Sequence, residues 1–193
     1  MKLKPGVKAP EFNVNDQNGK PVSLKSLKGK KVVLYFYPKD MTPGCTAESC
    51  NLRDNYKTLQ KQGYEVFGIS SDNEKSHQKF IAKEKLPFSL LADTDKKVHE
   101  AYGTWVEKSM YGRKYMGTAR TTFLIDEAGK IAEIITRVDT KNHTEQILGL
   151  KMEETKSADV KVKSPVGIKK KPAPKSSART KVKSVKKSAG KKS

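Results

Sequence analysis

The stretch from residue 32 to residue 50, VVLYFYPKDMTPGCTAESC, constrains the fold of this chain more than any other. It opens on a run of apolar, β-branched and aromatic residues, which is typical of a buried strand. Pro38 cannot continue a central strand, and the residues after it favour a turn. From Thr46 onward apolar residues recur at helical spacing, and Gly63 is a typical helix stop. The pattern predicts a strand, a turn and a helix, with Cys45 in or near the first helical turn.

The start of a helix favours an ionised thiol at Cys45. Unpaired N–H groups and about half a positive charge lie there, and both stabilise a thiolate. Cys50 follows on the same predicted helix. In an ideal helix the two Cα atoms would lie ~8.6 Å apart, whereas a disulfide tolerates at most about 7 Å. The pair could therefore be bridged only if the first turns of the helix unwind, which fits a redox cycle better than a permanent disulfide.

Two other uses of the cysteines stay open on the residues alone. A free cysteine is often simply a buried apolar residue. Paired thiolates could also bind zinc, which takes four ligands. His77, His99 and His143 show no ligand spacing with the two cysteines, and we expect these histidines to be surface or capping residues.

The spacing of Pro38, Thr42 and Cys45 matches Pro-x-x-x-Thr-x-x-Cys, the active-site signature of the peroxiredoxins. The longer string Thr-Pro-Gly-Cys-Thr-Ala-Glu-Ser-Cys resembles the peroxiredoxin Q subgroup, also called bacterioferritin comigratory proteins. Downstream, YGRKYMGTARTTFLID carries Arg120 where that family has its active-site arginine, just before a strand. The resemblance covers roughly residues 3–150.

This resemblance implies a thioredoxin-like α/β fold, with a central mixed sheet flanked by helices. It also implies a thiol-dependent peroxidase that reduces hydrogen peroxide and organic hydroperoxides without metal or organic cofactor, with thioredoxin as the reductant. Cys45 would be the peroxidatic nucleophile and become a sulfenic acid. Cys50 would be the resolving thiol and form a Cys45–Cys50 disulfide. A thioredoxin-like disulfide reductase is less favoured because the Cys-x-x-Cys spacing is absent.

The resemblance assigns roles to the residues around the nucleophile as well. The Thr42 hydroxyl would accept from or donate to the reacting groups, and Thr42, the Cys45 N–H and Arg120 would be the donors where charge develops on the leaving oxygen. Arg120 would also hold Cys45 ionised through its charge. Pro38 would shield the thiolate from solvent. Glu48, one turn into the helix, is expected to interact with the helix dipole, with a role in positioning Arg120 as the alternative.

The rest of the first 150 residues alternates between strand and helix patterns, which favours an α/β layer structure. The expected elements are a hairpin over residues 9–24, a helical turn at 24–29, strands at 64–70 and 88–91, helices at 73–85 and 94–102, a hairpin over 121–136, and a last helix capped by Asn142. Trp105 and Tyr111 fall in a predicted loop before Arg120, where we expect packing residues, with walls of an apolar substrate entrance as the alternative.

The positive charge of the chain is concentrated at its end. Residues 151–193 hold 15 basic and 3 acidic residues, a net +12 out of +19 for the whole chain. They contain no aromatic residue and have prolines at 165, 172 and 174. Such a composition cannot offset the entropy lost on ordering. We therefore expect a domain over residues 1–152 and a disordered Lys-rich tail over 153–193.

Three uses of this tail stay open. It could be an inert solubilising segment, or a nuclear localisation signal through KKKPAPK. It could also bind DNA or RNA without sequence preference, through counterion release. The lack of aromatic residues argues against base stacking.

The sequence also bounds the compartment. It contains no apolar run long enough for a signal peptide or a membrane span, and a chain with two cysteines suits a reducing compartment. We expect a cytoplasmic protein without membrane partners, nuclear or nucleoid-associated if the tail directs it there. A monomer is expected because no added dimerisation segment is apparent.

Overall fold

The computed structural model describes residues 3–110 and 112–149. By its contacts the chain divides into two units, Met1–Glu154 and Thr155–Ser193, and all described residues belong to the first. The expected tail over residues 153–193, the domain boundary before it and the expected packing role of Tyr111 lie outside the described residues. No helix in the described part of the chain is long and apolar enough to cross a membrane.

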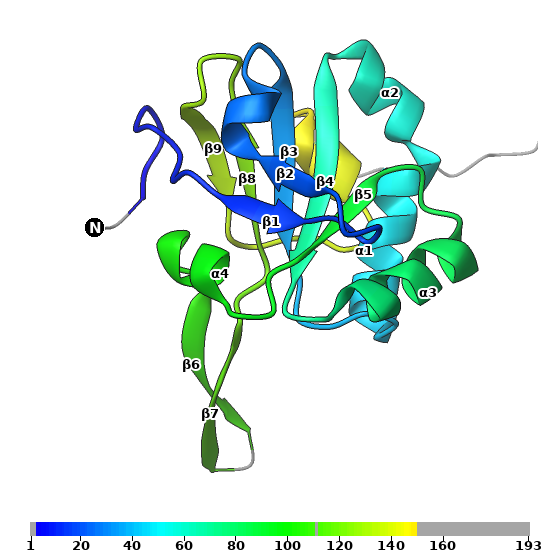
Figure 1. Ribbon diagram of the computed structural model, residues 1–193, viewed down its shortest axis with the longest axis vertical. Helices are drawn as coiled ribbons and strands as arrows, with labels where there is room; N and C mark the ends of the chain where they lie inside the picture. Colours follow the sequence, from blue (N-terminus) through cyan, green and yellow to red (C-terminus); the bar gives the residue numbers. More distant parts are fainter. Residues whose placement is uncertain (1–2, 111, 150–193) are drawn as a thin grey trace, which may run out of the picture. The chain divides into compact units, whose positions relative to one another are not determined.

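A five-stranded mixed sheet forms the centre of the first unit, in the order β5-β4-β3-β8-β9 (Figure 1). Its strands are β3 (Lys31–Phe36), β4 (Tyr64–Ser70), β5 (Ser89–Ala92), β8 (Thr121–Ile125) and β9 (Ile131–Ile135). β3 pairs in parallel with β4 and antiparallel with β8, and β4 pairs in parallel with β5. This arrangement confirms the predicted thioredoxin-like α/β fold with a central mixed sheet.

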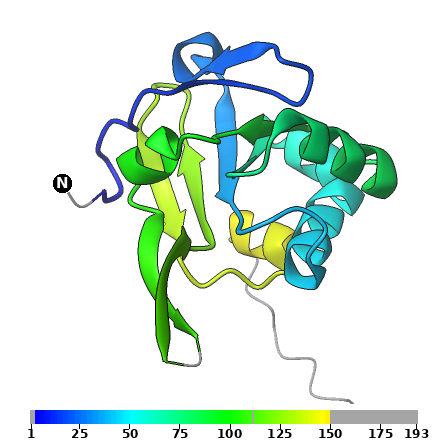
Figure 2. The same ribbon diagram turned by 60° about the horizontal axis from the view of Figure 1, so that its bottom comes forward.

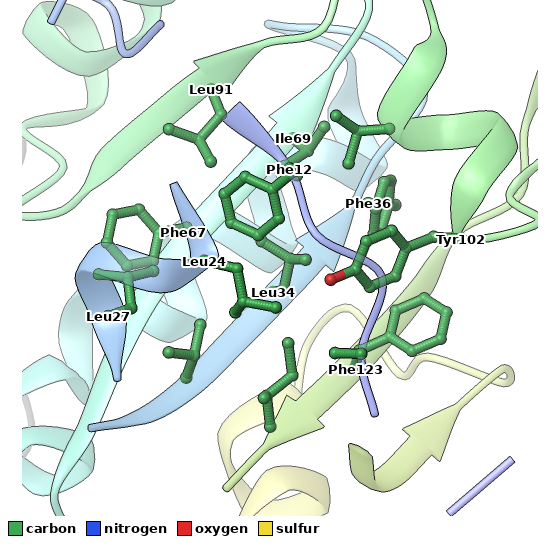
Figure 3. Packing of buried hydrophobic residues seen from close by; sticks show 14 of the residues in the cluster. Phe12, Leu24, Leu27, Leu34, Phe36, Phe67, Ile69, Leu91, Tyr102 and Phe123 are labelled. Atoms are coloured by element: carbon green, nitrogen blue, oxygen red, sulfur yellow. The ribbon is translucent and has the colours of Figure 1, made fainter. Parts of the chain in front are cut away.

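Alternate residues of β3 face opposite sides of the sheet, and each side is covered by its own core. The first core contains Val32, Leu34 and Phe36, and Figure 3 shows it packed with Phe12 and Tyr102. The segments that carry its other members include β1 (Asn13–Asn15), β2 (Pro21–Ser23), the 3-10 helix η1 (Leu24–Leu27) and α4 (Lys97–Ala101).

The second core lies on the opposite face of β3. It contains Val33, Tyr35 and Tyr37, packed with buried side chains such as Leu52 and Phe80. The helices that supply this side are α1 (Pro43–Asp54), α2 (Tyr56–Lys61), α3 (Glu74–Glu84) and α5 (His143–Ile147). α5 lies beside α1 (Figure 2), so the segment predicted to carry the reactive cysteine is enclosed between the sheet and other helices.

The predicted helix after Pro38 differs in its limits. It begins three residues before Thr46, with Pro43 in its first turn, where the fixed φ of proline suits a helix start. It is also interrupted at Asn55, which separates α1 from α2 and whose side chain donates to the Asn51 carbonyl at 2.9 Å. Cys45 therefore lies within the first turn, as the sequence predicts.

The prediction of a loop around Trp105 is wrong. Residues there form an antiparallel ribbon of β6 (Trp105–Met110) and β7 (Arg113–Thr118), which extends beyond the sheet (Figures 1 and 2). Most of β7 is exposed, so polar and charged residues occur on both of its faces and no alternation of apolar residues marks the strand.

The expectation that the three histidines are surface or capping residues is also wrong, because all three side chains are fully buried. Each has a partner from a distant or neighbouring segment. His77 Nδ1 lies 3.0 Å from Asp40 Oδ2, His99 Nδ1 lies 2.5 Å from Asp93 Oδ2, and His143 Nε2 lies 2.9 Å from Thr122 Oγ1. These hydrogen bonds offset the cost of burying a polar ring, although Nε2 of His99 has no hydrogen-bond partner among the described residues.

Candidate active site

The loop between β3 and α1 brings the motif residues to the start of the helix. Pro38 is half-buried two residues after the end of β3. Thr42 is the N-cap residue with an extended backbone, and its hydroxyl donates to the Lys39 carbonyl at 3.1 Å. Its side chain makes no capping bond to the helix. Cys45 is the third helical residue, so its N–H has no partner within the helix.

Arg120 forms hydrogen bonds with two buried side chains of α1, Cys45 and Glu48. It lies directly before β8, which pairs with β3 and so places the arginine beside the start of α1. Its Nη2 donates to Cys45 Sγ at 3.2 Å, and its Nη1 donates to Glu48 Oε2. Cys45 is 1% exposed and Glu48 is fully buried. A Cβ on Gly44 would lie 3.4 Å from Arg120 Nη2, so the glycine leaves room for the guanidinium.

The charges of Arg120, Glu48 and Cys45 act on one another. Burial raises the pKa of Glu48 to about 7, although Arg120 acts in the opposite direction. Burial alone would lower the pKa of Arg120, but Glu48 and Cys45 outweigh it, so the pKa is raised. The guanidinium therefore stays charged beside the Cys45 sulfur.

A second cation, Lys108 of β6, belongs to the same electrostatic environment. Burial and the charge of Arg120 lower the pKa of Lys108, and Cys45 opposes that shift. Its Nζ donates to the Thr118 carbonyl, two residues before Arg120. The sequence analysis missed Lys108, because nothing in its spacing separates it from the other basic residues of the chain.

Cys50 lies later on α1 and is partly exposed. Its Sγ donates to Glu84 Oε2 of α3 at 3.6 Å. Burial raises the pKa of Cys50; Arg53 opposes this and Glu84 adds to it. Both cysteines are free thiols in this structure. Because they occupy one continuous helix at a spacing that a disulfide cannot span, bridging them requires α1 to unwind locally.

The sequence analysis also missed two contacts between α1 and α5. His143 Nε2 lies 3.7 Å from Glu48 Oε1. Asn51 Oδ1 accepts from the Thr144 N–H at 2.8 Å, whereas the N-cap residue Asn142 makes no side-chain cap bond. The predicted capping role of Asn142 is thus taken by a residue of α1. The sequence offered one signal for these contacts: His143 follows Asn142, and asparagine is common at helix starts.

The described residues contain no group of three or more His, Cys, Asp or Glu side chains that could hold a metal ion.

This fold and this site define a class. The buried cysteine lies in the first turn of a helix that follows the central strand of a thioredoxin-like sheet, and it accepts a hydrogen bond from an arginine. This is the arrangement of a thiol-dependent peroxidase. The chain belongs to the AhpC/TSA family, whose profile matches residues 5–134. It is therefore a peroxiredoxin, and the predicted resemblance is confirmed.

Relatives of known name agree with this assignment. The chain is 50% identical over 149 residues to a putative peroxiredoxin Bcp of Coxiella burnetii, covering 77% of this chain and 99% of that protein. It is 47% identical over 146 residues to peroxiredoxin Bcp of Escherichia coli K12, covering 76% and 94%. A solved structure of the bacterioferritin comigratory protein of Xanthomonas campestris, described for its alkyl peroxide reduction activity, is 31% identical with a TM-score of 0.71, covering 76% and 96%.

Proposed function

We propose that Cys45 is the peroxidatic residue of this peroxidase and that its substrates are hydrogen peroxide and organic hydroperoxides. The thiolate attacks the terminal oxygen of the peroxide; an S–O bond forms and the O–O bond breaks. Cys45 becomes a sulfenic acid, and the other oxygen takes a proton and leaves as water or an alcohol. The 3.2 Å contact between Arg120 Nη2 and Cys45 Sγ is the observation that carries this proposal.

The neighbouring groups support the same step. The leaving oxygen gains negative charge, which Arg120 and the Cys45 N–H can stabilise as fixed donors. The Thr42 hydroxyl donates a hydrogen bond to the Lys39 carbonyl, so its oxygen can accept a hydrogen bond from the peroxide. Pro38, half-buried beside this loop, would limit access of water to the thiolate.

Cys50 is proposed as the resolving residue. Its sulfur attacks the Cys45 sulfenic acid, an S–S bond forms, and the hydroxyl leaves as water. Glu84, which already accepts the hydrogen bond of the Cys50 thiol, is placed to take its proton. Thioredoxin would then reduce the disulfide with two electrons. Alkyl peroxide reduction by the Xanthomonas relative supports organic hydroperoxides as substrates.

Peroxide consumption coupled to thioredoxin, thioredoxin reductase and NADPH tests these roles. We expect Cys45→Ser to abolish consumption. Cys50→Ser should still reduce one equivalent of peroxide, but it should neither turn over with thioredoxin nor form the intrachain disulfide. Mass spectrometry of the wild type after one equivalent should show a bridged Cys45–Cys50 peptide that is lighter by two hydrogen atoms. Full turnover by Cys50→Ser would rule out the resolving role.

The charge of residues 151–193 favours a second activity. With a net charge of +12 and no aromatic residue, this segment is proposed to bind DNA or RNA without sequence preference. Gel shifts of the full chain and of a chain ending at Leu150 test this: binding should require the segment and weaken steeply with salt. Equal binding by both chains would exclude it. We further propose a monomer in a reducing compartment such as the cytoplasm, which sedimentation and fractionation can check.

A further inference from the structure

The turn between β3 and α1 contains a peptide unit that is hydrogen-bonded on both sides. In the peptide that joins Lys39 to Asp40, the Asp40 N–H donates to Asp72 Oδ2 at 2.8 Å, and the Lys39 carbonyl accepts from the Thr42 hydroxyl at 3.1 Å. A trans peptide is planar, so its N–H and its carbonyl point in opposite directions and neither can turn without the other. Asp72, which lies between β4 and α3, is therefore connected to the Thr42 hydroxyl through one rigid unit.

The side chain of Asp40 anchors the same unit in the interior. This side chain is buried, and its carboxylate oxygens accept from the Tyr37 hydroxyl at 2.7 Å and from the Ser76 hydroxyl at 2.6 Å. Nδ1 of His77, on α3, lies 3.0 Å from Asp40 Oδ2. Burial would raise the pKa of Asp40, but the hydrogen bond and the charge of His77 outweigh it, so the pKa is lowered. Asp40 is thus held as a carboxylate.

The ring of His77 donates on both sides. Its Nδ1 faces the carboxylate of Asp40, and its Nε2 lies 3.2 Å from the Leu91 carbonyl of β5. Both partners can only accept, so both ring nitrogens carry a proton and the ring is positively charged. A buried ion pair between α3 and the turn therefore fixes the Asp40 end of the peptide unit, and this leaves Asp72 to set the direction of its N–H.

Backbone strain marks the same turn. Met41, between Asp40 and Thr42, has a φ of 58°. This left-handed conformation is costly for any residue with a side chain and persists where the surrounding contacts hold it. The Thr42 hydroxyl makes no capping bond to α1, so its orientation depends on the Lys39 carbonyl. Strain at Met41 would turn that carbonyl away if the peptide were not held.

We propose that Asp72 is a positioning residue for peroxide reduction: by holding the Lys39–Asp40 peptide, it makes the Thr42 hydroxyl point its proton at the Lys39 carbonyl and its lone pair at the peroxide. The inference rests on the peroxidatic role proposed for Cys45. A hydroxyl group rotates to suit its neighbours. Without a fixed acceptor, Thr42 would present its proton to the peroxide in some molecules and its lone pair in others. Asp72 thus acts on the reaction through Thr42.

Single-turnover rates of the reduced full chain with hydrogen peroxide test this inference. Asp72→Ala removes the acceptor of the Asp40 N–H, so we expect the rate to fall roughly fivefold to twentyfold. Asp72→Asn keeps an acceptor oxygen at the same place, so its rate should stay within about twofold of the wild type. Asp72 is only partly buried, so both variants should fold. Equal rates for Asp72→Ala and the wild type would overturn the proposal, and so would an Asp72→Asn rate as low as that of Asp72→Ala.

A charge-matched control separates the hydrogen bond of Asp72 from its negative charge. Glu74→Ala removes one carboxylate from the start of α3, where Glu74 Oε1 accepts from Asn15 Nδ2 at 3.1 Å. Its rate should stay within about twofold of the wild type. An equal fall for Glu74→Ala and Asp72→Ala would assign the effect to charge and overturn the proposal.

The double variant with Thr42→Val distinguishes orientation of the hydroxyl from a general effect on the turn. Valine keeps the shape of threonine and lacks the hydroxyl. In this background Asp72→Ala should change the rate by less than about twofold, because no hydroxyl is left to orient. A fall by the same factor in both backgrounds would show that Asp72 only supports the structure of the turn, which would overturn the proposal.

Alkylation of Cys45 by iodoacetamide, followed by peptide mass mapping, reports the thiolate without peroxide. For Asp72→Ala its rate should stay within about twofold of the wild type while the peroxide rate falls, because Arg120 still contacts the sulfur. A parallel fall in both reactions would mean that the variant disturbs Cys45 itself, and the assignment to Thr42 would be wrong. The proposed function fails separately: peroxide consumption by Cys45→Ser refutes the peroxidatic role. An inactive Cys45→Ser beside a fully active Asp72→Ala refutes only the role of Asp72.

Discussion

The guanidinium of Arg120 donates hydrogen bonds to both Cys45 and Glu48, because its nitrogens point in different directions. Nη2 reaches the sulfur and Nη1 the carboxyl oxygen, so one planar group bonds two buried acceptors at once. A lysine at this position would supply a point charge without the second directed donor. The site thus depends on the residue type as well as on positive charge.

Glu48 and His143 contribute to stability with opposite dependence on pH. The pKa of Glu48 is raised from 4.5 to about 7, so its contribution is complete below about pH 4.5 and is lost as the pH rises through 7. The pKa of His143 is lowered from 6.5 to about 4, so its contribution is complete above pH 6.5 and is lost as the pH falls through 4. Each amounts to about 3 kcal/mol, as an order of magnitude.

These two slopes largely cancel in the wild type between pH 4.5 and 6.5, and single variants should reveal them. For Glu48→Gln we expect a free energy of unfolding that rises from pH 4.5 to 6.5 and does not fall up to pH 8. For His143→Leu we expect a fall between pH 4.5 and 7. Urea unfolding over this range, with all other groups unchanged, measures both. Curves that run parallel to that of the wild type would show that neither group titrates as described.

The elements that the sequence predicted best are those specified by local signals. The apolar run of β3, the stop at Pro38 and the turn after it lie within twenty residues, so the position of Cys45 near a helix start followed from them, although the helix begins at Pro43 and not near Thr46. The ribbon β6–β7 carries no such signal, because its exposed strands need no apolar face. The histidines were misjudged for another reason: His77, for example, is satisfied by Asp40, and no local pattern reports that contact.

The contact between Arg120 and Cys45 could be expected from the family resemblance alone. Arg120 is one of 40 basic residues, and its proximity to α1 depends on the pairing of β8 with β3. Glu48 has the same limitation, since a carboxylate one turn into a helix is usually a solvated partner of the helix dipole. Its complete burial depends on the packing of α5 against α1, which the sequence around Glu48 does not reveal.

At the scale of elements, Asn51 joins α1 to α5 and should be important for both stability and disulfide formation. Its Oδ1 accepts from the N–H and the hydroxyl of Thr144, each at 2.8 Å, and its Nδ2 donates to the Lys141 carbonyl at 2.6 Å. Asn51→Ala should lower the free energy of unfolding by about 1–3 kcal/mol, because it removes a helix cap and leaves polar groups unpaired. It should also speed formation of the Cys45–Cys50 disulfide, since α1 is held less firmly.

Chemical denaturation and quenched-flow mass spectrometry measure these two effects. Asn13→Ala, on the exposed strand β1, is the matched control and should change stability by less than about 0.5 kcal/mol. A destabilised Asn51→Ala protein with an unchanged rate of bridging would mean that α1 unwinds without separating from α5.

At the scale of the whole first unit, oxidation should destabilise the protein although it adds a disulfide. Closing the short loop between Cys45 and Cys50 gains about 2 kcal/mol from the lower entropy of the unfolded chain. Unwinding α1 breaks the Arg120–Cys45 bond, the Asn51–Thr144 bonds and the bond from Arg53 Nη1 to the Glu84 carbonyl at 2.6 Å. At about 1 kcal/mol for each of the two neutral bonds and about 2 for each of the two charged ones, these losses come to about 6 kcal/mol.

The balance is a loss of about 4 kcal/mol, which for a unit of this size corresponds to a Tm about 8–16 °C lower in the oxidised form. Calorimetry of the reduced protein and of the protein bridged by one equivalent of peroxide measures the difference. Cys50→Ser treated in the same way keeps α1 folded and should show little change in Tm. A higher Tm for the bridged protein would mean that α1 keeps its contacts with α3 and α5 after oxidation. In that case the two cysteines would have to meet through a smaller rearrangement confined to the first turn, with Asn51 and Arg53 still in place.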